Sequence, residues 1–201
     1  MPAHKLFDEQ HALEQAMFVF WQYGYVGTSM QMLVDAMKIK RGSLYGTFGN
    51  KDALFLKALE YYNLFYRKRA LESLLVSGLP AIEIIKLWLS RAAKVDLEKG
   101  IKGCFLVNTS MDRAPHNLAV AVVIKKTGEE MIQLFVGLLE QGKVQGSIDS
   151  QLNSFTAGQS LFTTLTGLFV LARGGAKSTF MNSVIEDALS KLTLKQQGTL
   201  L

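Results

Sequence analysis

The chain has 201 residues, 49 % of them hydrophobic, and a chain of this length buries enough surface for a core without a disulfide or a metal staple. Its formal net charge of +5 is moderate, and its single cysteine, Cys104, excludes an intramolecular disulfide framework and indicates a reducing compartment. The sequence contains neither a secretory leader nor an uncharged apolar run of about 18 residues, so we expect a cytoplasmic protein that does not enter a membrane.

The first part of the chain has the apolar spacing of amphipathic helices. It predicts helices over about residues 8–23, 28–37, 40–48 and 50–75. Gly24 is placed to end the first helix in a left-handed conformation, and Thr28 or Ser29 is placed to cap the second. Two short helices held between longer ones are typical of a helix-turn-helix, although any helical hairpin in a bundle gives the same pattern.

The same periodicity continues to the end of the chain. It predicts helices over about residues 80–98, 104–111, 116–141, 150–173 and 179–192. Pro80 suits the first turn of the helix over residues 80–98, and Ser147 or Asp149 is placed to cap the helix over residues 150–173. The fold class is therefore predicted to be all-α with about nine helices, in two domains of residues 1–50 and 51–201.

A short basic stretch, KIKRGSLYGTFGNK, occupies residues 38–51. It contains Lys38, Lys40, Arg41 and Lys51 and no acidic residue, while its glycines each cost about 0.5–1 kcal/mol in a helix interior. This cost argues against a plain solvated basic face and favours close approach of the backbone to a polyanion. We expect Lys40 and Arg41 to reach guanine edges or phosphates in a major groove, and Lys51 to meet a phosphate at a helix N-terminus.

Several short motifs occur in register around this stretch. In order, they are an aromatic-x-x-x-Gly-Tyr helix end, a Thr-Ser helix opening, and Gly-Ser-Leu-Tyr followed by Phe and Lys-Asp-x-Leu, all within FWQYGYVGTSMQMLVDAMKIKRGSLYGTFGNKDAL. Together they resemble the N-terminal DNA-binding domain of the tetracycline-repressor (TetR) family of transcriptional regulators. The match covers roughly residues 10 to 56, about a quarter of the chain.

The resemblance implies roles for individual residues. Family members hold the phosphate backbone at the positions of Thr28, Tyr45 and Lys51. Their recognition helix meets bases or adjacent phosphates at the positions of Lys40, Arg41, Gly42 and Ser43. Two residues depart from the pattern. Lys38 occupies a turn position that is usually glycine, where a left-handed lysine costs about 1 kcal/mol, and Lys40 replaces a serine-like cap.

The resemblance also implies a homodimer whose C-terminal domain encloses a cavity for a small-molecule effector and whose last two helices pair across a two-fold axis. Small residues in the predicted helix 150–173 suit such a pairing face: Ala157, Gly158, Ser160 and Gly167. A helix buried within the monomer is the open alternative. Candidates for the ligand site lie on the middle helices: Trp88, Cys104, Phe105, Asn108, Met111, Phe135 and Phe162. Such a set is more often a plain core.

Cys104 follows Gly103 at a predicted helix start, with Lys99 and Lys102 nearby. A helix N-terminus and neighbouring cations lower the pKa of a thiol, so we expect a raised thiolate fraction. The segment also resembles the Gly-Cys-x-Leu-x-Asn stretch of one subgroup of the family, some members of which respond to oxidants or electrophiles. The open alternative is a small buried residue at a helix start.

The sequence therefore predicts a DNA-binding transcriptional regulator and not an enzyme. In this interpretation a homodimeric repressor binds a palindromic operator and is released by a small molecule or by modification of Cys104. The alternatives are a cysteine-dependent enzyme, for which His116 is a poor base, and a helical protein-binding adaptor. No metal or cofactor is expected, because no Cys/His pair has ligand spacing. Asp112 and Arg113 are expected to form an ordinary ion pair on a helix surface, with an active-site pair as the alternative.

Overall fold

A computed structural model describes residues 7–93 and 103–193 of the chain. The regular structure in these two ranges is entirely helical, which confirms the predicted fold class. The chain divides into two compact units, one made of Met1–Ala70 and Asp96–Ile124 and the other of Leu71–Val95 and Lys125–Leu201. The domain boundary near residue 50 stays a prediction, and it falls inside the first unit.

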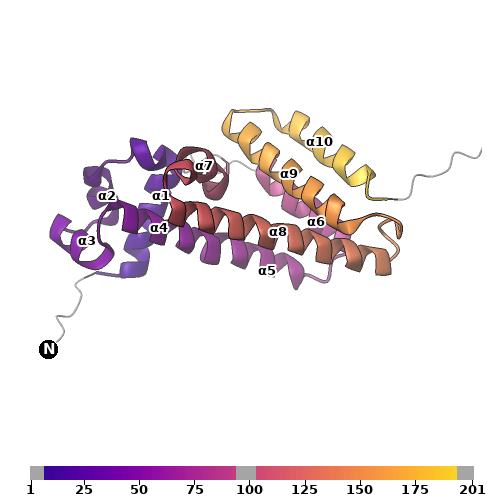
Figure 1. Cartoon of the computed structure of the whole chain (residues 1–201), viewed down its shortest axis with the longest axis horizontal. Helices are drawn as coiled ribbons and strands as arrows, with labels where there is room; N and C mark the ends of the chain where they lie inside the picture. Colours follow the sequence, from indigo (N-terminus) through magenta and orange to yellow (C-terminus); the bar gives the residue numbers. More distant parts are fainter. Residues whose placement is uncertain (1–6, 94–102, 194–201) are drawn as a thin grey trace, which may run out of the picture. The chain divides into compact units, whose positions relative to one another are not determined.

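The first unit gathers a small bundle of helices around α1. Its elements are α1 (Glu9–Gly27), α2 (Met30–Met37), α3 (Arg41–Phe48), α4 (Lys51–Tyr61), a π-helical segment (Tyr62–Lys68), α7 (Phe105–Asp112) and a 3₁₀ turn (Ala114–His116). The Asp8 carboxylate caps α1 by accepting from the backbone N–H groups of Gln10 and His11 at 2.9 and 3.1 Å. Helix α1 packs against α2, α4 and α7, and α3 packs against α4 (Figure 1).

Large apolar side chains fill the centre of this unit. Those with less than 2 % of their surface exposed include Met17, Phe20, Leu33, Leu44, Leu54 and Phe55. The ring of Phe55 makes edge contacts with Phe20 and Phe105, at 4.9 and 5.6 Å between centroids. Aromatic pairs of this kind contribute about 0.5–1.5 kcal/mol each beyond the area that they bury. They join α1, α4 and α7 into one core.

The second unit is built from longer helices. It contains α6 (Ala81–Ser90), α9 (Ser154–Arg173), α10 (Ser178–Ser190) and most of α5 (Arg69–Leu75) and α8 (Leu118–Val144). Helix α10 packs against α6 and α9. Helix α9 buries one stripe of residues, which includes Leu161, Leu165, Leu168 and Ala172. Its Gly158 lies against α8, where an added Cβ would stand 3.0 Å from Cγ2 of Val136.

The predicted helices are present, with differences at their ends. If α4, the π-helical segment and α5 are taken as one continuous run, the described residues contain nine α-helices. The helix expected over 80–98 is α-helical to Ser90 and 3₁₀-helical to Ala93, and the rest of that prediction lies outside the described residues. The cap expected at Ser147 or Asp149 is wrong, because Asn153 caps α9 by accepting from the Thr156 N–H at 3.0 Å.

Helix α9 is also the one described helix whose length and apolar character would suffice to cross a membrane. The mean hydropathy of its most apolar window is 1.3, and 28 % of that window is buried. A core helix of a bundle meets the same two criteria, and the buried stripe along α9 is what such a helix has. Packing therefore accounts for the buried stripe of this helix.

Candidate nucleic-acid interface

The basic stretch forms the turn between α2 and α3, the whole of α3 and the start of α4. The Ser29 hydroxyl caps α2 by accepting from the Met32 N–H at 3.1 Å. Helix α2 ends at Lys38, whose φ of 53° and ψ of 38° confirm the left-handed conformation expected there. Lys40 precedes α3 without a side-chain cap bond. Both departures from the family pattern therefore leave a lysine where the backbone favours another residue, and each adds positive charge.

One face of α3 is open and carries most of the residues predicted to contact DNA. Lys40, Arg41 and Gly42 are exposed, Ser43 is half-buried, and Tyr45 has 44 % of its surface exposed. The guanidinium of Arg41 lies 6.0 Å from the centroid of the Tyr45 ring. A Cβ placed on Gly42 or on Gly46 would meet no atom within 4 Å. No contact within the described chain requires these glycines, so the bare backbone of α3 is available to an outside partner.

The opposite face of α3 holds the helix in place. Leu44 has no exposed surface, and Phe48 has 4 % exposed. Lys57 of α4 donates to the Thr47 carbonyl at 3.3 Å and lies 5.7 Å from the centroid of the Phe48 ring. A cation at this C-terminal end also interacts favourably with the helix dipole. A short helix that contains two glycines is therefore stabilised by tertiary contacts and not by its own propensity.

The start of α4 combines a helix N-terminus with a lysine. Asn50 caps the helix by accepting from the Ala53 N–H at 2.9 Å. The ammonium of Lys51 lies 4.4 Å from the centroid of the Tyr25 ring. Burial lowers the pKa of Lys51, while the Asp52 carboxylate beside it raises that pKa. A cation and free N–H groups at one helix N-terminus are suited to bind a phosphate.

Known proteins share this arrangement. The model of the tetR family of bacterial regulatory proteins matches residues 12–58, which span most of α1 to α4. YezE of Bacillus subtilis (strain 168), an uncharacterized HTH-type transcriptional regulator, is 29 % identical over 157 residues, which are 78 % of this chain and 81 % of that protein. The HTH-type transcriptional repressor ComR of Escherichia coli (strain K12) is 29 % identical over 182 residues, 86 % of this chain and 82 % of that protein. Residues 12–58 of the chain are therefore similar to the tetR family.

A solved structure of this family has the same architecture over nearly the whole chain. It contains a cysteine-substituted variant of the TetR family transcriptional regulator CifR in complex with a 26-base-pair operator DNA. The two chains are 28 % identical with a TM-score of 0.77, and the match covers 93 % of this chain and 98 % of the other. The protein is therefore a helix-turn-helix transcriptional regulator, with α2 and α3 as the two helices of the motif.

Thr28, which the family pattern places against a phosphate, is 2 % exposed. Its hydroxyl donates to the Gly24 carbonyl at 2.6 Å, and its backbone N–H donates to the Tyr25 carbonyl at 3.4 Å. Both donors are engaged at the kink where Gly24, with a φ of 71°, interrupts α1. A phosphate contact of Thr28 stays a prediction, and it would require one of these bonds to break.

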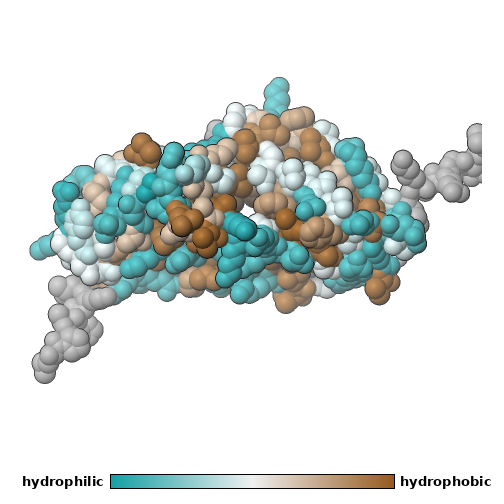
Figure 2. Space-filling model, in the orientation of Figure 1, coloured by the Kyte–Doolittle hydropathy of each residue, from teal (hydrophilic) through white to brown (hydrophobic). Residues whose placement is uncertain are grey.

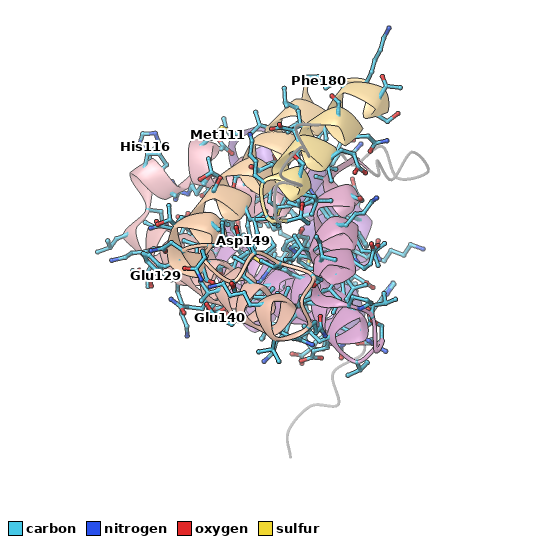
Figure 3. The ribbon with its side chains drawn as sticks, turned by 90° about the vertical axis from the view of Figure 1, so that its right-hand side faces the viewer. Met111, His116, Glu129, Glu140, Asp149 and Phe180 are labelled. Carbon is cyan, nitrogen blue, oxygen red and sulfur yellow. The ribbon has the colours of Figure 1, made fainter. Side chains whose placement is uncertain are left out.

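The residues predicted for a ligand site fall in both units. Cys104, Phe105, Asn108 and Met111 belong to the first unit, and Trp88, Phe135 and Phe162 belong to the second. Met111 is 58 % exposed, and its side chain lies at the surface, as does that of His116 (Figure 3). Phe162 packs on α8, where its ring lies 3.2 Å from the place of a Cβ on Gly128. The Nε1 atom of Trp88 is buried and has no hydrogen-bond partner in the described part of the chain.

Cys104 lies at the N-terminal end of α7 and is only 6 % exposed. The Tyr62 hydroxyl donates to its sulfur at 3.4 Å. Burial raises the pKa of the thiol, and this exceeds the lowering by Tyr62 and by backbone N–H groups at the start of α7. The expectation of a lowered thiol pKa is therefore wrong for the described residues, because desolvation dominates. The cations expected to contribute, Lys99 and Lys102, lie outside the described residues.

Sequence reasoning missed a charged group around Tyr25. Arg113 forms an ion pair with Asp52 of α4, and the Asp112 carboxylate accepts from the Tyr25 backbone N–H at 3.0 Å. Both residues thus contact distant segments, which corrects the expected pairing of Asp112 with Arg113. The tyrosine that follows Gly24 in the family motif was the available signal, but nothing in the sequence indicates its partners.

Proposed function

We propose that the protein is a homodimeric repressor that binds a palindromic operator through two copies of α3 and leaves it when a small molecule binds or Cys104 is modified. The observation that carries DNA binding is the exposed face of α3, where Gly42 and Gly46 leave the backbone bare beside Lys40 and Arg41. Two relatives support the proposal, since ComR is named a repressor and the CifR variant is bound to operator DNA. A regulator of this kind acts in the cytoplasm, where a bacterial chromosome lies.

The residues of α3 and α4 take different roles in this proposal. Lys40 and Arg41 reach base edges or adjacent phosphates from the first turn of the recognition helix. Ser43 and Tyr45 supply hydroxyl donors for phosphates, and Gly42 allows the close approach. Lys51 binds a phosphate together with the N-terminus of α4. One short helix contacts too few base pairs for specificity, so two copies on a palindrome are required.

The surface that we propose for the second copy is the outer side of α9 and α10. Phe155, Val170 and Phe180 have 52, 40 and 51 % of their surface exposed, and apolar side chains gather over these helices in Figure 2. Gly167 faces open space, since a Cβ placed on it would meet no atom within 4 Å. A helix of a second copy can approach closely there. Gly158, in contrast, is occupied by the packing of α9 on α8.

The second unit also offers a polar atom for an effector. The buried indole N–H of Trp88 has no partner among the described residues. An unsatisfied buried donor costs about 1–3 kcal/mol, and a largely apolar ligand with one acceptor would remove that cost. We therefore place α6 at the effector site. Such a ligand weakens DNA binding only to the extent that it prefers the conformation that does not bind DNA.

Modification of Cys104 is the second proposed signal, and with it we propose that the chain resembles the Gly-Cys-x-Leu-x-Asn subgroup. The thiol is enclosed among Tyr62 and the neighbouring core residues, so an adduct at the sulfur needs space that the close-packed interior does not contain. Modification would then act by displacing α7. The chain has no second cysteine, so the products are a sulfenic acid, an adduct or a disulfide bond between two subunits.

Binding to a labelled duplex of mixed sequence at increasing salt tests the DNA-binding function. A regulator that contacts phosphates loses affinity steeply, with a linear dependence of log K on log salt. Absence of binding even at low salt would refute the proposal and favour the adaptor or the enzyme. Sequencing the duplexes that the protein selects from a random pool is expected to give a palindrome.

Labelling with N-ethylmaleimide tests the cysteine signal. Modified wild-type protein is expected to lose affinity for the selected duplex, whereas the Cys104→Ser variant treated in the same way keeps it. Equal affinity of labelled and unlabelled wild-type protein would show that Cys104 is structural.

A further inference from the structure

Two charged residues at the C-terminal end of α7 contact the helix start that carries Lys51. The Arg113 guanidinium lies 4.1 Å from the centroid of the Tyr25 ring and pairs with Asp52. Lys51 lies over the same ring, at 4.4 Å. The Tyr25 hydroxyl donates to Asp52, and this bond, followed by the Arg113 contact, holds the pKa of the Asp52 carboxyl below its ordinary value. The side chains of Lys51, Arg113 and Asp52 therefore all contact Tyr25.

Asp112 holds that tyrosine from its backbone side. Gly24 has a φ of 71°, which breaks the helix and frees the N–H group of Tyr25. The Asp112 carboxylate accepts from this N–H at 3.0 Å, and the same oxygen lies 3.0 Å from the place where a Cβ of Gly24 would stand. The glycine is thus required both by its backbone conformation and by the approach of Asp112. The hydrogen bond between Asp112 and Tyr25 thus connects the end of α7 to the kink of α1.

The position of Asp52 makes Arg113 important for DNA. Asp52 follows Lys51 directly, and its side chain is 48 % exposed, so a phosphate bound at Lys51 would lie close to a carboxylate. Arg113 is 17 % exposed and compensates that carboxylate from the protein side. Without the guanidinium, a like charge would face the phosphate and Tyr25 would lose a neighbour that orients it.

We propose that Arg113 is a positioning residue for the phosphate contact of Lys51: it neutralises Asp52 and, with Asp112, fixes Tyr25 under the lysine. The inference rests on the proposed function, because it presupposes that Lys51 binds a phosphate. It assigns the positioning of the Lys51 contact to a residue that follows the C-terminal end of α7, outside the matched segment of residues 12–58.

The test compares Arg113→Met, Arg113→Lys, Asp52→Asn and the double variant Arg113→Met/Asp52→Asn on a labelled duplex of mixed sequence. We expect Arg113→Met to weaken binding about tenfold and to lower the salt slope by about one, as Lys51→Met does. Adding Asp52→Asn should restore most of the affinity, and Arg113→Lys should stay within about threefold of wild type. Lys125→Met removes the same charge from α8 and serves as the control for net charge.

Circular dichroism confirms that each variant is folded before binding is measured. The inference is overturned if wild type binds the duplex and folded Arg113→Met binds equally well. It is also overturned if Asp52→Asn fails to restore binding, or if Arg113→Lys loses as much as Arg113→Met, because a purely structural role predicts both. If wild-type protein binds no duplex at low salt, the proposed function itself fails.

Discussion

Glycine occurs inside helices of both units, and it serves opposite purposes in them. In α3, the places of the missing Cβ atoms of Gly42 and Gly46 are empty. At Gly142 of α8 and Gly158 of α9 they are filled, because a Cβ on Gly142 would lie 2.4 Å from Ile148 and one on Gly158 would lie 3.0 Å from Val136. Gly142 and Gly158 make room for the chain itself, whereas no atom of the described chain fills the places beside Gly42 and Gly46.

This difference distinguishes the glycines that packing within the chain requires from those that it does not, without reference to related proteins. A glycine in a helix interior costs about 0.5–1 kcal/mol, and a close contact within the chain explains that cost at Gly142 and Gly158. No described contact explains it in α3. We propose that an external partner accounts for this cost, and the adjacent cations Lys40 and Arg41 favour an anionic one.

The largest expected effect comes from filling a packing glycine. Gly158→Ala should destabilise the protein by about 1–3 kcal/mol, because its Cβ would stand 3.3 Å from the Ile132 carbonyl oxygen, a backbone atom of α8 that cannot rotate away. Urea unfolding measures the change. Gly137→Ala in α8 is the matched control, since its Cβ meets no atom within 4 Å and its stability should rise slightly. Equal results for both variants would contradict the distinction.

Replacing a glycine of α3 should affect DNA binding and should not reduce stability. Gly42→Ala and Gly46→Ala are expected to leave stability unchanged or to raise it by up to about 1 kcal/mol, because they remove the entropic cost of glycine. Affinity for the selected operator should fall by about tenfold, because the added methyl group meets the DNA. Fluorescence anisotropy and urea unfolding on the same samples give both quantities. Loss of stability without loss of binding would show that these glycines serve the fold.

Lys38 is the converse case, a left-handed position without glycine. Lys38→Gly should stabilise the protein by about 1 kcal/mol, since glycine adopts a φ of 53° without steric cost. Lys38→Ala removes the charge but keeps the strain, so its stability should match that of wild type. Thermal unfolding of the three proteins separates backbone from side chain. If both variants gain stability equally, the strain is not at the backbone of residue 38.

The elements were predictable where local chemistry determines them. The break in α1 at Gly24 and the apolar side of α3 at Leu44 and Phe48 follow from spacing and from residue type, and the left-handed Lys38 follows from the family pattern. The π-helical segment was not predictable, because residue Tyr62 in it packs on Trp21 and Phe105, which are distant in sequence. Propensity carries no information about such contacts.

The candidate site was likewise predictable only in its local features, and not in the contacts between segments that are distant in sequence. The basic residues of α3 and Lys51 are visible in the sequence, because they are local and unpaired with acids. The partners of Lys51 were not visible, since Tyr25 and Arg113 are brought to it by the packing of α1 and α7 on α4. The prediction of a lowered pKa for Cys104 was wrong for the same reason, because burial depends on tertiary packing.

The smallest expected effect concerns the thiol of Cys104, which is buried, whereas the face of α3 that carries Lys40 and Arg41 is exposed. Because burial raises the pKa of Cys104, its alkylation rate should climb only above the ordinary thiol range of about 8.5. The Tyr62 hydroxyl favours the thiolate, so Tyr62→Phe should raise the pKa further and slow iodoacetamide labelling at fixed pH about two- to threefold. Tyr61→Phe is the control, since Tyr61 stacks on Phe65 instead. In denaturant all three proteins should react alike, and a native rate equal to that unfolded rate at neutral pH would mean that the thiol is not protected.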